Sequence, residues 1–335
     1  MNNYIVRLTP IDSYFFGGEV TFGEGTNQNY LVESNLLPQV STVLGVMRYV
    51  ILRQENLLAA KSQDDFERVK SLIGEKGFCM DSKVTNYGVI KQISPVFVEN
   101  YADHKYYMPM PLDFGYDVRS DEDFEFLTEA FAYKKKGIEI EKFDCKNYDN
   151  YQYWIDNSGK EKLKESAIFK EVTQVGITKN NRRDDENDAF LKQKSYRMAY
   201  GFCFTLFVSL DYDLDVSDSF VFMGGNRSMF RMQIEKKNYD FKTTFSALKK
   251  DGRKLLLGDA FFTDKERESM PFCWGCAVAN RYIITNYSSS KKWDKPVKTE
   301  KLFKLLKRGG VVLADCEDEI PAKEYLTNVG LNIFI

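Results

Sequence analysis

The fold of this chain is decided by the stretch LLPQVSTVLGVMR at residues 36–48. Pro38 ends an extended run, and Ser41 or Thr42 can cap the helix that follows it. Apolar side chains then recur at the spacing of one buried helical stripe. The members of this stripe are Val40, Val43, Leu44, Met47, Val50 and Ile51. The segment therefore predicts an amphipathic helix with one face in the core.

A second face of the same helix is polar. Ser41, Gly45 and Arg48 follow one another along it at helical spacing. A hydroxyl, a residue without a side chain and a guanidinium allow a phosphate backbone to come close to a helix N-terminus. A capped surface helix that contains a glycine explains the same residues, and on this segment alone that simpler interpretation is preferred.

Length and composition indicate a folded protein without a bulk charge. The 335 residues suffice for two domains, or for one large domain with insertions. Hydrophobic residues make up 43% of the chain and aromatic residues 15%, which favours a packed core over extended disorder. The formal net charge is -2, so any contact with a polyanion must come from local basic patches.

The cysteines do not predict a metal site. Six are spread along the chain, and only Cys273 and Cys276 form a CxxC pair, with no second pair or histidine near them. We therefore expect buried, reduced thiols, no metal, no cofactor and a reducing, cytoplasmic environment. No apolar stretch has the length of a membrane span and the first residues lack the form of a signal peptide, so no membrane partner is expected.

Strands are predicted where side chains alternate between two faces, and this alternation is most regular at residues 4–8 and 201–210. Further strands are expected at residues 220–223, 230–234, 282–285, 311–314 and 331–335, and further helices at residues 58–74 and 299–307. Pro109 and Pro111 predict an edge strand or a connector, and residues 117–170 read as a polar insertion. This order of elements indicates an α+β fold and argues against a doubly wound parallel sheet.

The case for catalysis is weak. His104 is the one histidine of the chain, so every arrangement that needs a histidine base would have to use it. The sequence has no GxSxG elbow, no GxxxxGK[ST] phosphate loop and no GxGxxG turn that opens a helix. We expect His104 to be an exposed loop residue and predict no catalytic residue.

Three segments fit the binding of a polyanion better. The turn at residues 224–231 combines two glycines with two arginines and a hydroxyl, so that backbone amides and guanidinium groups can meet phosphates. A basic stretch at residues 288–308 ends in Arg308, Gly309 and Gly310. A polar segment at residues 176–186 is typical of a protruding hairpin, or thumb, whose tip enters a nucleic acid. A tight hairpin turn, a solvated lysine-rich surface and a mobile loop are the respective alternatives.

The order of these motifs resembles the RAMP superfamily of CRISPR proteins. The N-terminal half of that pattern is carried here by Asp12, Phe15, Phe16, Phe22 and Gly23, followed by Pro38, Ser41, Gly45 and Arg48. The later motifs lie at residues 94–95, 107–111, 175–177, 224–227 and 308–311. Taken in that order, they look like the family that supplies the third subunit of the Cmr-type (type III-B) effector complex. The resemblance spans nearly the whole chain.

The resemblance implies a fold of two ferredoxin-like (RRM-like) modules with insertions and a protruding hairpin thumb. We expect the first module at residues 1–240, with an insertion near 117–170 and a thumb near 177–190, and the smaller second module at residues 241–335. It also implies a non-catalytic RNA-binding subunit, active in antiviral defence, that holds the 5′ repeat-derived tag of the guide (CRISPR) RNA. The implied partners are the large polymerase-like effector subunit, the backbone RAMP subunits and, through the complex, target RNA.

With the basic turn at residues 308–310 included, the expected RNA-binding residues come from four segments. They are Ser41, Thr42, Gly45 and Arg48; Gly176, Ile177, Lys179, Arg182 and Arg183; Gly224, Gly225, Asn226, Arg227, Ser228 and Arg231; and Arg308, Gly309 and Gly310.

Two positions depart from the pattern of the family. Leu44 takes the place of a lysine before the helix glycine, and Asn226 takes the place of an acidic residue in the glycine turn. Two alternatives stay open: a repeat-RNA endoribonuclease of the same superfamily, and a structural scaffold that makes no direct RNA contact. Residues 30–54 contain no histidine, where such an endoribonuclease usually has one.

Overall fold

The computed structural model describes residues 1–17, 30–78, 80, 83–111, 152–178, 189–215, 218–225, 227–249, 253–269, 273–274, 280–282, 285–286, 297–298, 303–313 and 323–335. They form a mixed α+β fold in which most strands are antiparallel. None of the helices in these ranges is long and apolar enough to cross a membrane.

The largest unit of the fold is a nine-stranded sheet. Its order is β11-β12-β1-β10-β4-β5-β6-β7, and β3 also pairs with β10. The strands are β1 (Asn2–Pro10), β3 (Ile90–Ile93), β4 (Phe97–Asn100), β5 (Lys105–Pro109), β6 (Tyr153–Asp156), β7 (Lys162–Lys164), β10 (Phe202–Leu210), β11 (Asp218–Met223) and β12 (Ser228–Lys236). All of these pairings are antiparallel.

The first strand of the chain lies in the middle of this sheet. On β1, Val6 faces Leu206 of β10 on one side and Ile234 of β12 on the other. Alternate residues of these strands are buried on one face, as the alternation at residues 4–8 and 201–210 predicted. We call this the inner face of the sheet.

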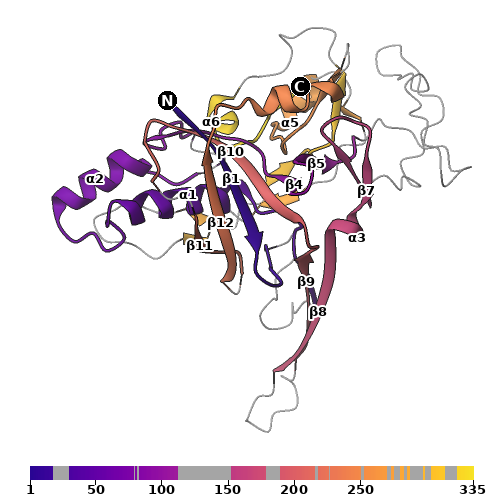
Figure 1. The fold of residues 1–335 in the computed structure, drawn as a ribbon, viewed down its shortest axis with the longest axis horizontal. Helices are drawn as coiled ribbons and strands as arrows, with labels where there is room; N and C mark the ends of the chain where they lie inside the picture. Colours follow the sequence, from indigo (N-terminus) through magenta and orange to yellow (C-terminus); the bar gives the residue numbers. More distant parts are fainter. Residues whose placement is uncertain are drawn as a thin grey trace, which may run out of the picture.

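Helix α1 (Val40–Gln54) packs its predicted apolar stripe against the inner face (Figure 1). The predicted cap was wrong, because the helix begins at Val40, before Ser41 and Thr42. Gln39 occupies the N-cap in an extended conformation without a side-chain cap, and its carbonyl accepts hydrogen bonds from the N–H groups of Thr42 and Val43. Helix α2 (Gln63–Ile73) follows, within the predicted range, and begins with a capping box formed by Ser62 and Asp65.

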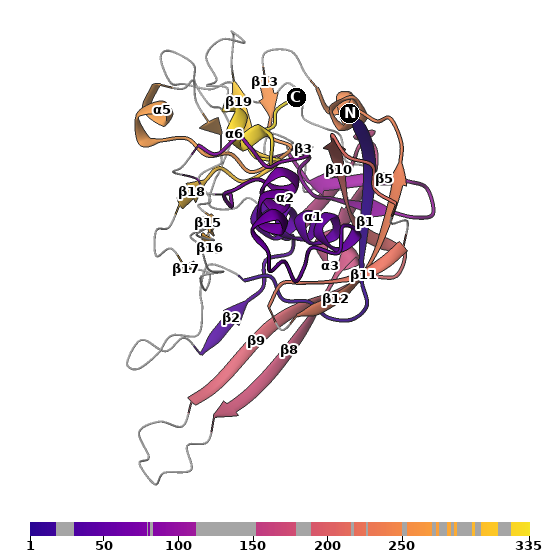
Figure 2. The same ribbon diagram turned by 90° about the vertical axis from the view of Figure 1, so that its left-hand side faces the viewer.

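The opposite, outer face of the sheet is covered over part of its area. There Ile5, Phe97 and Phe207 pack beneath α4 (Phe241–Thr244) and the short helix η3 (Ser246–Leu248). Leu255 and Val311 of the C-terminal strands join the same cluster. Near the top of the molecule lie β13 (Arg253–Leu255), β19 (Val311–Leu313) and α6 (Glu324–Thr327) (Figure 2).

The C-terminal elements of the chain are short. They are β13 (Arg253–Leu255), α5 (Asp264–Ser269), β14 (Cys273–Trp274), β15 (Asn280–Tyr282), β16 (Thr285–Asn286), β17 (Val297–Lys298), β18 (Phe303–Leu305), β19 (Val311–Leu313) and α6 (Glu324–Thr327). The strand predicted at residues 331–335 was wrong, because Asn332 has a φ of +53° that interrupts an extended run. Ile335 still exchanges backbone hydrogen bonds of 2.9 and 3.1 Å with Leu255.

A long hairpin projects from the opposite end of the molecule (Figures 1 and 2). It consists of β8 (Phe169–Thr178), which follows the short helix α3 (Glu165–Ile168), and β9 (Ala189–Met198). Strand β2 (Leu31–Glu33) pairs in parallel with the middle of β9 and adds a third strand to the hairpin. The thumb predicted near residues 177–190 would lie at the far end of this hairpin, but residues 179–188 are outside the described residues, so the thumb stays a prediction.

Three predictions about individual elements need correction. Strand β5 is neither an edge nor a connector, because it pairs with β4 and β6, and Pro109 is tolerated as its last residue. Residues 303–305 of the predicted helix at 299–307 form β18, where buried Phe303 and Leu305 alternate with Lys304. Residues 153–164 of the predicted polar insertion supply β6 and β7 of the main sheet, whereas residues 112–151 lie outside the described residues.

Candidate nucleic-acid interface

The loop at residues 12–17 joins the elements that carry the predicted RNA-binding motifs. Tyr14 exchanges backbone hydrogen bonds of 2.8 and 3.1 Å with Tyr196, at the base of the hairpin. The carbonyl of Phe15 accepts a 2.7 Å bond from the N–H of Gly225, in the turn between β11 and β12. The carbonyl of Phe16 accepts a bond from Asn35, in the segment that leads to α1. This short loop therefore brings the hairpin, the glycine turn and the approach to α1 together.

The glycine turn is shaped by its contact with this loop. Gly224 has a φ of +77°, and a Cβ atom there would lie 2.5 Å from the carbonyl oxygen of Phe15. A Cβ atom on Gly225 would lie 2.9 Å from the Phe15 ring. The N–H of Gly225 is already bonded to Phe15, so this amide is not available to a phosphate. The glycines thus serve a close approach of two backbones, a role that the sequence pattern did not predict.

Arg227 is the exposed cation of the turn. Its φ of +48° is unusual for a residue with a side chain, and no hydrogen-bond or ion-pair partner contacts it among the residues the structure describes. Ser228 donates a weak 3.4 Å bond to the Gly225 carbonyl. Asn226, which lies between Gly225 and Arg227 in the sequence, is outside the described residues.

Arg231 differs from Arg227 because its charge is already paired. Its Nε lies 3.2 Å from both carboxylate oxygens of Asp218, and its Nη2 lies 2.5 Å from one of them. The hydrogen bond from Arg231 lowers the pKa of the Asp218 carboxyl below its usual value. An RNA phosphate would have to compete with this carboxylate.

The exposed face of α1 contains Gly45, Tyr49 and Arg53. Among the described residues, no atom outside the local backbone of α1 lies within 4 Å of a Cβ built on Gly45, so the surface is open there. Tyr49 is 40% exposed, and the Arg53 guanidinium lies 5.9 Å from the centre of its ring. Ser41 and Thr42 are half-buried in the first turn. Our sequence reasoning missed Tyr49 and Arg53, although they follow Gly45 at successive steps of four residues.

Arg48 points away from this open face. Its Nη2 donates a 2.7 Å bond to the carbonyl of Lys76, and its guanidinium lies 5.6 Å from the centre of the Tyr87 ring. The Nε atom is buried and has no acceptor among the described residues. Burial lowers the pKa of Arg48 to about 10, so the group stays charged near neutral pH. The structure therefore does not bring Arg48 together with Gly45, contrary to the expectation from helical spacing.

The basic turn at residues 308–310 is in the interior. The N–H of Arg308 donates a 2.8 Å bond to Asp259, and its Nη1 donates a 2.6 Å bond to the Val96 carbonyl. Gly309 has a φ of +82° and approaches the carbonyl of Met110, while Gly310 is buried. These contacts assign the turn a packing role, and we remove Arg308, Gly309 and Gly310 from the candidate interface.

The hairpin is fastened at its base by charged and aromatic side chains. The Nζ of Lys194 lies 2.9 Å from Glu33 and 3.0 Å from Glu171, and the hydroxyl of Tyr196 donates a 2.6 Å bond to Glu33. Gly176 is exposed on β8, and Ile177 follows it in the same strand. The basic residues expected at the tip, namely Lys179, Arg182 and Arg183, lie outside the described residues.

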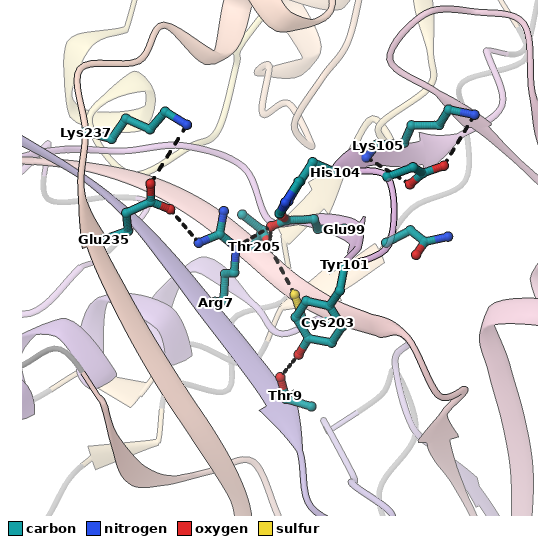
Figure 3. Close-up of polar contacts among 12 residues, drawn as sticks. Arg7, Thr9, Glu99, Tyr101, His104, Lys105, Cys203, Thr205, Glu235 and Lys237 are labelled. Atoms are coloured by element: carbon teal, nitrogen blue, oxygen red, sulfur yellow. Dashed lines mark hydrogen bonds and ion pairs between the residues drawn. The ribbon is translucent and has the colours of Figure 1, made fainter.

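His104 belongs to a separate cluster on the outer face of the sheet (Figure 3). Its side chain is 70% exposed in a loop, as expected, and its Nδ1 lies 3.0 Å from Glu99. Glu99 is fully buried and also accepts bonds from Arg7 Nε at 2.7 Å and from the Thr205 hydroxyl at 2.8 Å. The described residues contain no group of three or more metal-ligating side chains.

Comparison with known proteins gives consistent matches. A family model described as CRISPR-associated protein (Cas_Cmr3) matches residues 6–298. A chain of a cryo-EM structure of the type III-B Cmr-beta bound to cognate target RNA is similar, with a TM-score of 0.54 and 12% identity. That match covers 99% of this chain and 96% of the other. No curated protein matches the sequence.

Two further solved structures have lower TM-scores. A second structure of the Cmr-beta, with target RNA and AMPPnP, has a TM-score of 0.48 at 11% identity and covers 93% of this chain and 86% of the other. A Csm3-Csm4 subcomplex of the type III-A interference complex has a TM-score of 0.38 at 12% identity and covers 93% of this chain and 92% of the other. At such identities these likenesses concern the fold alone.

Proposed function

We propose, because the chain belongs to the family of CRISPR-associated proteins described as Cas_Cmr3, that it is a non-catalytic RNA-binding subunit of a type III-B effector complex. In this role it holds the 5′ repeat-derived tag of the guide RNA and docks on the large polymerase-like subunit, beside the backbone RAMP subunits. The two ferredoxin-like modules belong to the same proposal.

The observation that carries this proposal is the junction made by the loop at residues 12–17. Through Tyr14, Phe15 and Phe16 it places the base of the hairpin, the turn with Arg227 and the approach to α1 next to one another. A strand of RNA that crosses this junction would meet an exposed guanidinium at the turn. Charge-assisted hydrogen bonds to phosphate are the strong contacts of such interfaces.

The open face of α1 supports the same function. The empty space over Gly45 allows a sugar–phosphate backbone to approach the helix closely. Tyr49, one turn further along, offers an aromatic side chain on which a base can stack, and Arg53 holds its ring. In this proposal phosphate contacts position the RNA, and the hairpin projects into the space through which the RNA runs.

The absence of catalysis is part of the proposal and has two supports. Residues 30–54, where a related endoribonuclease usually has a histidine, contain none. His104 lies on the outer face of the sheet, and its Nδ1 contacts a carboxylate that is itself bonded to Arg7 and Thr205.

The test is a binding titration of the full chain with single-stranded RNA of the 5′ repeat-derived tag, at two salt concentrations. We expect Arg227→Ala to weaken binding about tenfold, because a charge-assisted bond is lost, and to lower the salt dependence by about one phosphate contact. Arg68→Ala is the matched control, since Arg68 is exposed on α2 and paired with Glu55. Equal binding by R227A and the wild type would remove the turn from the interface, and metal-independent cleavage of repeat RNA by the wild type would contradict the non-catalytic role.

A further inference from the structure

We propose that the uncovered part of the outer face of the main sheet stacks unpaired bases of single-stranded RNA on Phe220 and Phe222. This inference rests on the proposed function and adds to it a second RNA-contacting surface, on the opposite side of the sheet from α1. We call the surface of Phe220, Phe222, Met229 and Arg231 the open patch.

The open patch follows from the register of β11 and β12. Phe220 lies opposite Arg231 and Phe222 lies opposite Met229, so all four side chains project from the same face. The residues between them, such as Val221, are buried with α1 on the inner face. Phe220 is 53% exposed and Phe222 is 62% exposed, although apolar side chains of this size are usually buried.

The two phenylalanine rings have no aromatic partner among the described residues. On the covered part of the same face the rings are stacked, as Phe207 is on Tyr239 with ring centres 4.8 Å apart. Phe97 likewise stacks on Phe245 at 4.5 Å. Phe220 and Phe222 are two residues apart on one strand, which separates their attachment points by about 7 Å. Two neighbouring bases of an extended RNA strand could each lie on one ring.

The charges around the open patch favour a polyanion. Asp218 and Arg231 neutralise each other through their paired contacts. Arg227, at the turn that joins β11 to β12, is exposed and has no ion-pair partner among the described residues. Arg227 therefore adds one unpaired positive charge at the turn next to the exposed rings. Each nucleotide supplies both a base for a ring and a phosphate for the guanidinium.

The edge of the sheet argues against one common mode of protein docking. Strand β11 is the outermost strand, but the carbonyl of Phe220 accepts a 3.5 Å bond from the Nη1 of Arg53. This side chain of α1 blocks part of the edge to which a partner strand would have to pair. The flat face of the patch stays open.

The test compares two short single-stranded RNAs, one with all bases and one with abasic nucleotides in the same phosphate backbone. We expect the wild-type chain to prefer the RNA with bases, and the double variant F220L/F222L to bind that RNA about tenfold more weakly or worse, with unchanged affinity for the abasic RNA. Leucine keeps the apolar character but removes the flat ring. Tyr200→Leu is the matched control, because Tyr200 is a fully exposed aromatic residue at a turn outside the patch.

The design separates this inference from the proposed function. Arg227→Ala should weaken the binding of both RNAs alike, because it removes a phosphate contact and no ring. If R227A has no effect while F220L/F222L loses the preference for RNA with bases, Arg227 does not contact RNA, and the proposal that the open patch stacks bases is supported. If the wild type does not distinguish the two RNAs, or if F220L/F222L binds both as the wild type does, the open patch is wrong.

A second measurement uses the assembled effector complex. A photoreactive p-benzoyl-phenylalanine in place of Phe222 should crosslink to the guide or target RNA. A crosslink only to a protein subunit would identify the patch as a protein interface and overturn the proposal, as would the absence of any crosslink. Urea unfolding of F220L/F222L should match the wild type, since both side chains are largely exposed.

Discussion

Arg7 reaches across strand β10 and places its Nε 2.7 Å from the Oε2 of Glu99. Thr205 lies between them on β10 and donates to the same carboxylate at 2.8 Å. Glu99 is fully buried, and Arg7 makes a second ion pair with Glu235 at the surface. Three strands are thus joined by one carboxylate on the outer face of the sheet (Figure 3).

Glu99→Ala should lower the free energy of unfolding by about 3 kcal/mol, because it leaves the half-buried guanidinium of Arg7 without its buried partner. Asp218→Ala breaks an exposed ion pair with Arg231 and should lower the free energy of unfolding far less than Glu99→Ala does. Urea unfolding of both variants measures the difference. Equal losses for the two variants would show that the burial of Glu99 does not strengthen its contribution.

Gly45→Ala should separate stability from RNA binding. Alanine in a helix interior is favoured over glycine, and open space surrounds the site, so the free energy of unfolding should rise by about 0.5–1 kcal/mol. The added methyl group should weaken binding of the 5′ tag, because the backbone of the RNA can no longer approach as closely. Thermal unfolding and a binding titration check the two effects. A more stable G45A with wild-type affinity would remove Gly45 from the interface.

Glu165 should make stability depend on pH. Its burial raises the pKa of its carboxyl, and Glu33 raises it further, against the lowering effect of Trp154, Lys194 and Lys307. A carboxyl whose pKa is raised in the folded state favours folding when protonated, so its contribution is present at acid pH and is lost as pH rises through the folded pKa.

Glu165→Gln should accordingly stabilise the chain near neutral pH. Glutamine keeps an acceptor for the 3.5 Å contact with Trp154 but carries no charge to desolvate. Urea midpoints of the wild type and E165Q, measured at about pH 4 and about pH 7, should differ more at the higher pH. An equal difference at both values would mean that Glu165 is ionised to the same extent in the folded and unfolded chain.

Arg308 and Arg227 should have opposite phenotypes. Arg308→Ala removes a buried ion pair with Asp259 and a hydrogen bond to the Val96 carbonyl and should cost about 3 kcal/mol of stability, with Arg308→Lys as a milder variant. Affinity of the folded R308K for RNA should stay at the wild-type value, whereas R227A should lose affinity and keep its stability. Urea unfolding and binding titrations of the two variants test this, and weaker RNA binding by a stable R308K would return Arg308 to the interface.

Periodicity predicted the central elements because packing follows it directly. The stripe of α1 and the alternation on β10 each describe a surface that must be buried, whatever else the chain does. The pairing of β1 with both β10 and β12 could not be predicted in this way, because each partner is about two hundred residues away.

The candidate site was less predictable because it depends on contacts between distant segments. Arg308 looked like a surface cation, but Asp259 and the carbonyl of Val96 hold it in the interior. Arg48 shares a helical spacing with Gly45, yet Tyr87 and Lys76 draw it away. No local pattern reveals such partners. The exposed ring of Tyr49 does have a local signal, its position one turn after Gly45.

The central position of β1 has a consequence for synthesis on the ribosome. Strand β1 leaves the exit tunnel long before its hydrogen-bonding partner β12, which ends at Lys236. At about 5–20 residues per second, β1 stays with both edges unpaired for on the order of ten to forty seconds until β10 and β12 have been made. During that interval its backbone is a template for wrong partners. Yield in the cell should therefore depend on chaperones that shield this strand.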